Sequence, residues 1–226
     1  MLQPKKKMTK REIKEDKFVQ AALSARIYVE ENYKKVLTVT GAIFAVIILL
    51  MVWRYVHKMN VENSSALLGK AQLEYQSLNY PKAKEFLFRL LEEYPGSSAA
   101  KQGKFLLANL YFQENNMEEA KRNFREFIDS YSGSNILLAS GLAGYAACLE
   151  KENSHREAAE YYERAQKRAP EFVEAPNYLF LAGLNYKEAG LNDKARAVFE
   201  KIVGDYSSSL RKEDARAELI ILAQKK

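Results

Sequence analysis

Three side chains in the sequence have the chemistry of catalytic or metal-binding groups: His57, His155 and Cys148. A nucleophile needs a base beside it, and a metal site needs several such ligands at close spacing. His155 stands next to Arg156 at a predicted helix start, which is typical of a solvated surface residue. Cys148 is the only cysteine, so no intrachain disulfide can form. It falls within a predicted helix, where a lone thiol usually serves packing.

The short motifs that carry enzyme chemistry are absent from the sequence. It has no His-x-x-x-His, Cys-x-x-Cys, Gly-x-x-x-x-Gly-Lys or Gly-x-Gly-x-x-Gly. Paired acids such as Glu92-Glu93 and Glu118-Glu119 stand among lysines and arginines, as on solvated helix faces. We therefore expect no catalytic residue, cofactor site, metal site or small-molecule substrate, and a function that is not enzymatic. A binding surface remains as the expected functional feature.

One uncharged stretch divides the chain. Val36–Trp53 is eighteen residues without a charge, and a helix of this length spans about 27 Å, close to the hydrocarbon thickness of a bilayer. Lys34 and Lys35 precede it, while Trp53 and Arg54 close it, as expected of interfacial flanks. A buried core helix is the alternative. We predict a membrane-spanning helix over 36–56 that is not a cleaved signal peptide, since no small-residue cleavage site follows it.

The positive charge of the chain lies before this stretch. Residues 1–35 hold ten basic and five acidic residues, and residues 54–226 hold 25 and 24. The longer part is nearly neutral, so the basic pI does not indicate nucleic acid binding. A basic arm fits the cytoplasmic side of a membrane. We expect a single-pass protein with a cytoplasmic N-terminus.

A helix is predicted ahead of the spanning segment. Thr9 and Glu12 have the spacing of a capping box, and apolar residues recur near helical spacing from Ile13 to Val29. We expect an amphipathic helix over about residues 10–33 within a basic arm of residues 1–35. It either lies on the cytoplasmic membrane surface or is solvated on all sides.

Beyond the anchor, the sequence repeats. Four segments align on Ala83, Ala120, Ala158 and Ala195, at steps of 37, 38 and 37 residues. Each alanine is followed four residues later by a bulky residue and is preceded twelve residues earlier by a small one. The bulky residues are Leu87, Phe124, Tyr162 and Phe199, and the small ones are Ala71, Ala108, Ala146 and Gly183. This pattern predicts stacked helix–turn–helix pairs whose small residues permit close helix approach.

The repeated segments resemble the tetratricopeptide repeat, and Leu142–Pro170 matches it best. The resemblance implies an all-α solenoid of about four repeats over 57–207. Residues 208–226 are expected to form a C-terminal capping helix. In such arrays the first helices of the pairs line a concave groove that binds polypeptides. Carried over, the groove residues are Phe105, Asn109, Phe112, Ala147, Asn177, Phe180 and Leu184. The alternative is that the phenylalanines among them pack against neighbouring helices.

The whole layout resembles the bacterial YfgM-like family, the ancillary subunit of the SecYEG translocon. The likeness is closest around the anchor, at Tyr28-Val29-Glu30-Glu31-Asn32 and Trp53-Arg54-Tyr55. It implies an inner-membrane protein with periplasmic repeats that binds translocon subunits, chaperones or emerging polypeptides. Two alternatives stay open: a scaffold subunit of an envelope assembly, such as a secretion or division machine, and an organelle import receptor.

Overall fold

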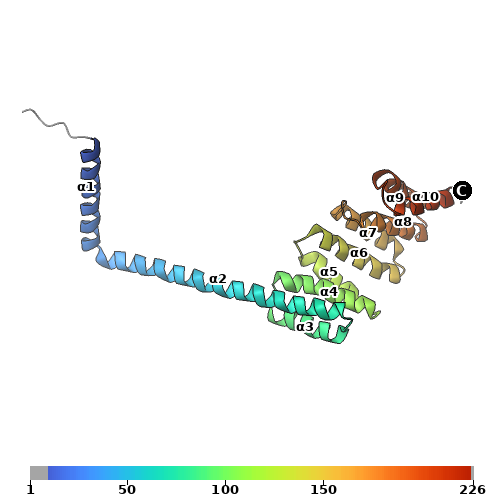
Figure 1. Ribbon diagram of the computed structural model, residues 1–226, viewed down its shortest axis with the longest axis horizontal. Coiled ribbons are helices and arrows are strands. Elements are labelled where there is room, and N and C mark those ends of the chain that lie inside the picture. The colour runs from blue at the N-terminus through green and yellow to red at the C-terminus, as the bar shows by residue number, and fades with distance from the viewer. Residues whose placement is uncertain (1–9, 225–226) are drawn as a thin grey trace, which may run out of the picture. The chain divides into compact units, whose positions relative to one another are not determined.

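A computed structural model describes the backbone of residues 10–224 and the side chains of residues 17–224. These residues form ten helices and no strand (Figure 1). The helices are α1 (Lys10–Glu31), α2 (Tyr33–Gln76), α3 (Tyr80–Glu93), α4 (Ser98–Gln113), α5 (Met117–Ser130), α6 (Asn135–Lys151), α7 (His155–Arg168), α8 (Ala175–Glu188), α9 (Asn192–Asp205) and α10 (Arg211–Gln224). The chain divides into two compact units, residues 1–58 and 59–226.

The first unit contains α1 and the apolar part of α2. The predicted helix forms over Lys10–Glu31, while Thr9 of its expected capping box lies outside the described residues. At about 100° per residue, Val19, Leu23 and Ile27 fall on the side of α1 opposite Phe18 and Val29. All five are exposed. The apolar side chains therefore surround α1 and do not form the single stripe that the sequence suggested.

Helix α2 is long and apolar enough to cross a membrane, and none of its apolar window is buried in the structure. This exposure argues against the core-helix alternative. The Thr38 and Thr40 hydroxyls donate to the carbonyls of Lys35 and Val36 at 2.9 and 2.8 Å, so these polar groups are satisfied within the helix. The helix continues to Gln76. Its last turns therefore belong to the second unit.

The second unit is a stack of helix pairs. The end of α2 pairs with α3, followed by α4 with α5, α6 with α7 and α8 with α9, and α10 packs on α9 and α8. The alanines that define the repeat are all fully buried, as are Leu87 and Phe199, while Phe124 and Tyr162 are nearly so. The predicted all-α tetratricopeptide solenoid with a capping helix is confirmed.

The four turns inside the pairs share one backbone conformation. Leu78, Asn115, Asn153 and Gly190 occupy equivalent positions and have φ of 60°, 59°, 59° and 74°. In each turn the next N–H bonds to a carbonyl five residues back, as from Asn116 to Tyr111 at 2.9 Å. Asparagine and glycine tolerate this left-handed region, whereas leucine does not. Leu78 is therefore the strained member of the set.

The helix caps only partly follow the sequence pattern. Asn116 has the sequence pattern of a cap before α5, and its side chain accepts from the Glu119 N–H at 3.3 Å. Ser154 has the same pattern and is the N-cap residue of α7, but its hydroxyl makes no cap bond. Ser97 caps α4 by accepting from Ala100 N–H at 2.9 Å. The helix starts therefore rest on tertiary packing as well as on local capping.

Candidate interaction surface

The groove residues lie on the first helices of three successive pairs. Phe105, Asn109 and Phe112 are on α4, Ala147 is on α6, and Asn177, Phe180 and Leu184 are on α8. All seven are half-buried. Helix α4 contacts α6, and α8 contacts α10, so first helices lie beside one another. The structure thus supplies a continuous set of adjoining helices for these side chains.

The three phenylalanines differ in what they contact. The Phe105 ring centroid lies 6.0 Å from that of Phe124 and 5.3 Å from that of Phe127. The Phe180 ring lies 5.7 Å from Phe199, and the Arg211 guanidinium covers it at 4.9 Å. Phe112 packs against the core but has no aromatic partner among the described residues. Phe105 and Phe180 therefore stabilise the helix pairs, as the packing alternative anticipated, while Phe112 packs on the core without such a ring contact.

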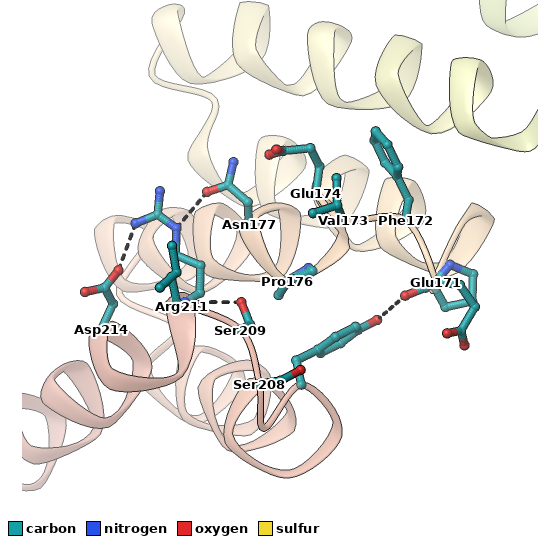
Figure 2. Close-up of a pocket in the computed structure, with 13 residues that line it drawn as sticks. Glu171, Phe172, Val173, Glu174, Pro176, Asn177, Ser208, Ser209, Arg211 and Asp214 are labelled. Atoms are coloured by element: carbon teal, nitrogen blue, oxygen red, sulfur yellow. Dashed lines mark hydrogen bonds and ion pairs between the residues drawn. The ribbon is translucent and has the colours of Figure 1, made fainter.

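The two groove asparagines are also engaged. Asn109 donates its amide N–H to the Phe105 carbonyl at 2.8 Å, within its own helix. Asn177 accepts from Arg211 Nε at 2.9 Å. Since Arg211 begins α10, this bond joins the capping helix to the fourth repeat. The Nδ2 group of Asn177 remains directed away from this contact (Figure 2).

A buried polar cluster joins α6, α7 and α8. The Glu150 carboxylate accepts from the Tyr162 hydroxyl at 3.0 Å and from Asn185 Nδ2 at 3.2 Å. Asn185 also donates to the Leu181 carbonyl at 3.0 Å, and its oxygen lies 3.0 Å from His155 Nδ1. Since the amide oxygen only accepts, His155 Nδ1 must carry a proton. Burial and the Glu150 carboxylate raise the pKa of Tyr162, so its phenol is a donor at neutral pH.

The remaining candidates for chemistry have no reactive setting. Cys148 is fully buried, and burial raises the pKa of its thiol to about 12, so it is not a nucleophile at neutral pH. The described residues contain no group of three or more His, Cys, Asp or Glu side chains that could hold a metal ion. His57 stacks on Trp53 with ring centroids 5.7 Å apart.

The anchor flanks lie in α2 as the sequence suggested. Lys34, Lys35, Trp53 and Arg54 are all exposed, and they bracket the apolar segment. Lys34 Nζ lies 6.0 Å from the Tyr33 ring. Aromatic and basic side chains at both ends of an apolar helix match the chemistry of the two membrane interfaces.

The sequence did not indicate the cavity at the end of the fourth repeat (Figure 2). Its volume is about 780 Å³. It is lined by Pro170, Glu171, Phe172, Val173, Glu174, Pro176, Asn177, Tyr206, Ser208, Ser209, Leu210, Arg211 and Asp214. Of the groove residues, it includes only Asn177. Most of its lining comes from two loops, where helical periodicity gives no signal.

Comparison with protein families matches residues 26–206 to the tetratricopeptide repeat-like domain. The chain belongs to this family. Tetratricopeptide repeat-like domains are generally protein–protein interaction modules and are typically non-catalytic. The match begins inside α1 and therefore includes the apolar helix as well as the four pairs.

Two solved structures support the tetratricopeptide fold. PilF of Pseudomonas aeruginosa matches with a TM-score of 0.56 and 22% identity, over 74% of this chain and 70% of PilF. MamA matches with a TM-score of 0.53 and 21% identity, over 73% of this chain and 86% of MamA. At these identities the likeness shows the fold alone. A comparison with curated proteins gives no match.

Proposed function

We propose that this tetratricopeptide protein is a membrane-anchored interaction module that holds polypeptide partners close to the bilayer. The observation that carries the proposal is α2, which runs without a break from the exposed apolar segment into the first repeat. The repeats therefore follow the apolar segment directly in the chain. The family's general role in protein binding supports the proposal that this protein binds polypeptide partners.

The groove residues are the proposed binding surface. Phe112 and Leu184 are half-buried apolar side chains on α4 and α8, and Ala147 is a half-buried small residue on α6. An extended or helical polypeptide can place apolar side chains on such a strip. An aromatic anchor of this kind contributes about 2 kcal/mol or more when a partner covers it.

The resemblance to the YfgM-like family supports a specific setting for this activity. We infer an inner-membrane protein with a cytoplasmic arm, periplasmic repeats, and translocon subunits, chaperones or emerging polypeptides as partners. The basic arm favours this orientation. Alkaline phosphatase fused after Lys226 should be active in bacteria. An inactive phosphatase together with an active cytoplasmic reporter at the same site would overturn the orientation.

Crosslinking in cells followed by mass spectrometry tests the partners. Photocrosslinkers at Phe112 and Leu184 should capture translocon subunits, chaperones or polypeptides in transit. A crosslinker at Phe88, an exposed residue of α3 outside the groove, serves as the control. Capture of one fixed set of other envelope proteins would favour the scaffold alternative.

Point variants separate binding from folding. Phe112→Ala should weaken capture about tenfold, equivalent to ~1.4 kcal/mol, and should lower the melting temperature less than Phe180→Ala does, because Phe112 packs on the core without an aromatic ring partner among the described residues. Phe180→Ala should lower the melting temperature as well, because Phe180 contacts Phe199 and Arg211. If Phe112→Ala leaves capture unchanged, the partner surface lies elsewhere.

A further inference from the structure

The cavity at the end of the fourth repeat is held open by a chain of hydrogen bonds. Gln166 donates to the Tyr206 hydroxyl at 2.7 Å, and that hydroxyl donates to the Pro170 carbonyl at 3.0 Å. Lys201 donates to Gln166 Oε1 at 3.1 Å. These bonds tie the loop between α7 and α8 to the loop between α9 and α10. The cavity is therefore preorganised, which lowers the cost of binding.

Two apolar side chains at this cavity are left in water. Leu210 is 94% exposed and Val173 is 78% exposed, the two highest values among large apolar residues of the second unit. Phe172 and Pro176 extend the apolar surface into the cavity. Figure 2 shows Val173 and Phe172 side by side on the loop before α8. Apolar side chains around a hollow mark a surface that a partner covers.

The charged groups of the cavity have one dominant sign. Glu171, Glu174 and Asp214 line it, and Arg211 is the single basic residue. Arg211 is already engaged, because it donates to Asn177 at 2.9 Å and to Asp214 at 2.9 Å. Glu171 and Glu174 are exposed and have no ion pair in the part of the chain that the structure describes. The cavity therefore offers two carboxylates to an incoming cation.

We propose that this cavity binds a segment of another polypeptide in which lysine or arginine stands next to large apolar residues. This inference rests on the proposed function and names the partner chemistry at one end of the groove. A cation of the segment pairs with Glu171 or with Glu174, whose carboxylates lie at different ends of the site (Figure 2), and the apolar neighbours cover Val173 and Leu210. Asn177, oriented by Arg211, presents its Nδ2 group to a carbonyl of the bound segment (Figure 2).

Three fluorescein-labelled peptides of about twelve residues test the proposal by fluorescence anisotropy with the full chain in detergent. They repeat Ser-Leu-Lys-Ser, Ser-Leu-Glu-Ser or Ser-Ser-Lys-Ser. The first should bind at least about tenfold more tightly than either of the others, because only it supplies both the cation and the apolar side chain. Equal binding of the lysine and glutamate peptides would overturn the charge assignment.

Variants then locate the site. Glu171→Gln with Glu174→Gln should weaken binding of the Leu-Lys peptide about tenfold. Glu188→Gln with Glu200→Gln is the matched control, because both carboxylates are exposed on the same repeat but lie outside the cavity. Leu210→Ser should also weaken binding while leaving the melting temperature unchanged, since the side chain is almost wholly solvated.

The outcomes separate this inference from the broader proposal. If the double glutamine variant binds normally and Phe112→Ala does not, the groove binds the peptide and the cavity assignment is wrong. If no variant affects binding and crosslinkers capture no partner, the proposed function fails as well. Self-association of the full chain in sedimentation that Leu210→Ser abolishes would show a second copy in the cavity and would also overturn the inference.

Discussion

Two neighbouring contacts in the repeat stack use opposite chemistry at equivalent positions. Between the second and third repeats, four of these positions hold an apolar set: Phe112, Met117, Phe124 and Cys148. Between the third and fourth repeats, the same positions hold a polar set: Glu150, His155, Tyr162 and Asn185. At both contacts the second helix of one pair packs on the first helix of the next pair. One backbone arrangement therefore accommodates either a hydrophobic contact or a hydrogen-bonded one.

The two contacts also differ in their periphery. Lys121 donates to Glu152 at 2.7 Å across the second–third contact, whereas Ala159 and Ala189 stand at the equivalent positions of the third–fourth contact. Phe127 fills the space over Gly141 in the first case. At the third–fourth contact the sizes are exchanged. Ala165 stands at the position equivalent to Phe127, and Tyr178 stands at the position equivalent to Gly141. Each contact thus conserves volume while distributing it differently.

This difference gives each repeat a preferred neighbour. If the fourth repeat docked on the second, Asn185 would meet apolar side chains and lose its hydrogen bonds to Glu150 and His155, keeping only the bond to Leu181 within its own helix. A buried amide without partners costs about 1–3 kcal/mol. The polar set therefore disfavours docking of the fourth repeat on the second, as a buried asparagine disfavours wrong registers in coiled coils.

The largest test of this comparison is Asn185→Ala. Asn185 is only 3% exposed, and its removal takes one donor from the Glu150 carboxylate and the only acceptor from His155 Nδ1. We expect a loss of about 2–4 kcal/mol in the free energy of unfolding. Urea unfolding of residues 59–226, followed by circular dichroism, measures it.

Cys148→Ala is the matched control because Cys148 is the equivalent residue in the apolar set. It removes one buried sulfur and should cost about 1 kcal/mol. An Asn185→Ala variant that loses no more stability than Cys148→Ala would mean that the polar set stabilises no better than ordinary packing.

The glycine under Phe127 supplies the next test. A Cβ at position 141 would lie 2.5 Å from Phe127 Cε1, and the ring is fully buried. Gly141→Ala should therefore lose about 1–3 kcal/mol despite alanine's higher helix propensity. Gly69→Ala in α2 meets nothing within 4 Å and should gain about 0.5–1 kcal/mol. Equal shifts in melting temperature for both variants would contradict the packing argument.

The repeat itself could be predicted from sequence because its signal is local. Ala158 and Tyr162 are four residues apart on one helix, and their spacing alone reports a buried face. The long apolar helix was equally visible, since its length and lack of charge are read directly from the sequence. The continuity of α2 follows from residues 54–76, which contain one glycine and no proline.

The polar set and the cavity could not be predicted in the same way. His155 and Asn185 are thirty residues apart, and their contact depends on the rotation of two helices. The cavity depends on the bond from Tyr206 to Pro170, which joins two loops across 36 residues. Sequence periodicity placed Phe105 and Phe180 correctly on first helices but did not reveal their packing on Phe124, Phe127 and Phe199.

Alkaline pH distinguishes the two contacts because only the apolar set carries a buried thiol. Burial raises the pKa of Cys148 to about 12, above the ordinary value of about 8.5 in the unfolded chain. The folded state then retains a proton that the unfolded state loses, so stability falls as the pH rises between these values. Relative to Cys148→Ala, the wild type should lose about 1 kcal/mol between pH 8.5 and 9.5. Parallel pH profiles of the two proteins would exclude this thiol effect.

The smallest expected effect comes from the charge pair that only the second–third contact has. The Lys121 and Glu152 side chains are each 33% exposed, so a double-mutant cycle with alanine should give a coupling of about 0.5–1 kcal/mol that weakens in high salt. The hydrogen bond to Glu152 raises the pKa of Lys121, so the coupling is present at neutral pH and is lost as the pH rises above about 10.4. The double variant has alanine at both positions, as the equivalent positions of the third–fourth contact do. A salt-independent coupling above about 2 kcal/mol would mean that the ion pair, and not the apolar set, decides how the second and third repeats associate.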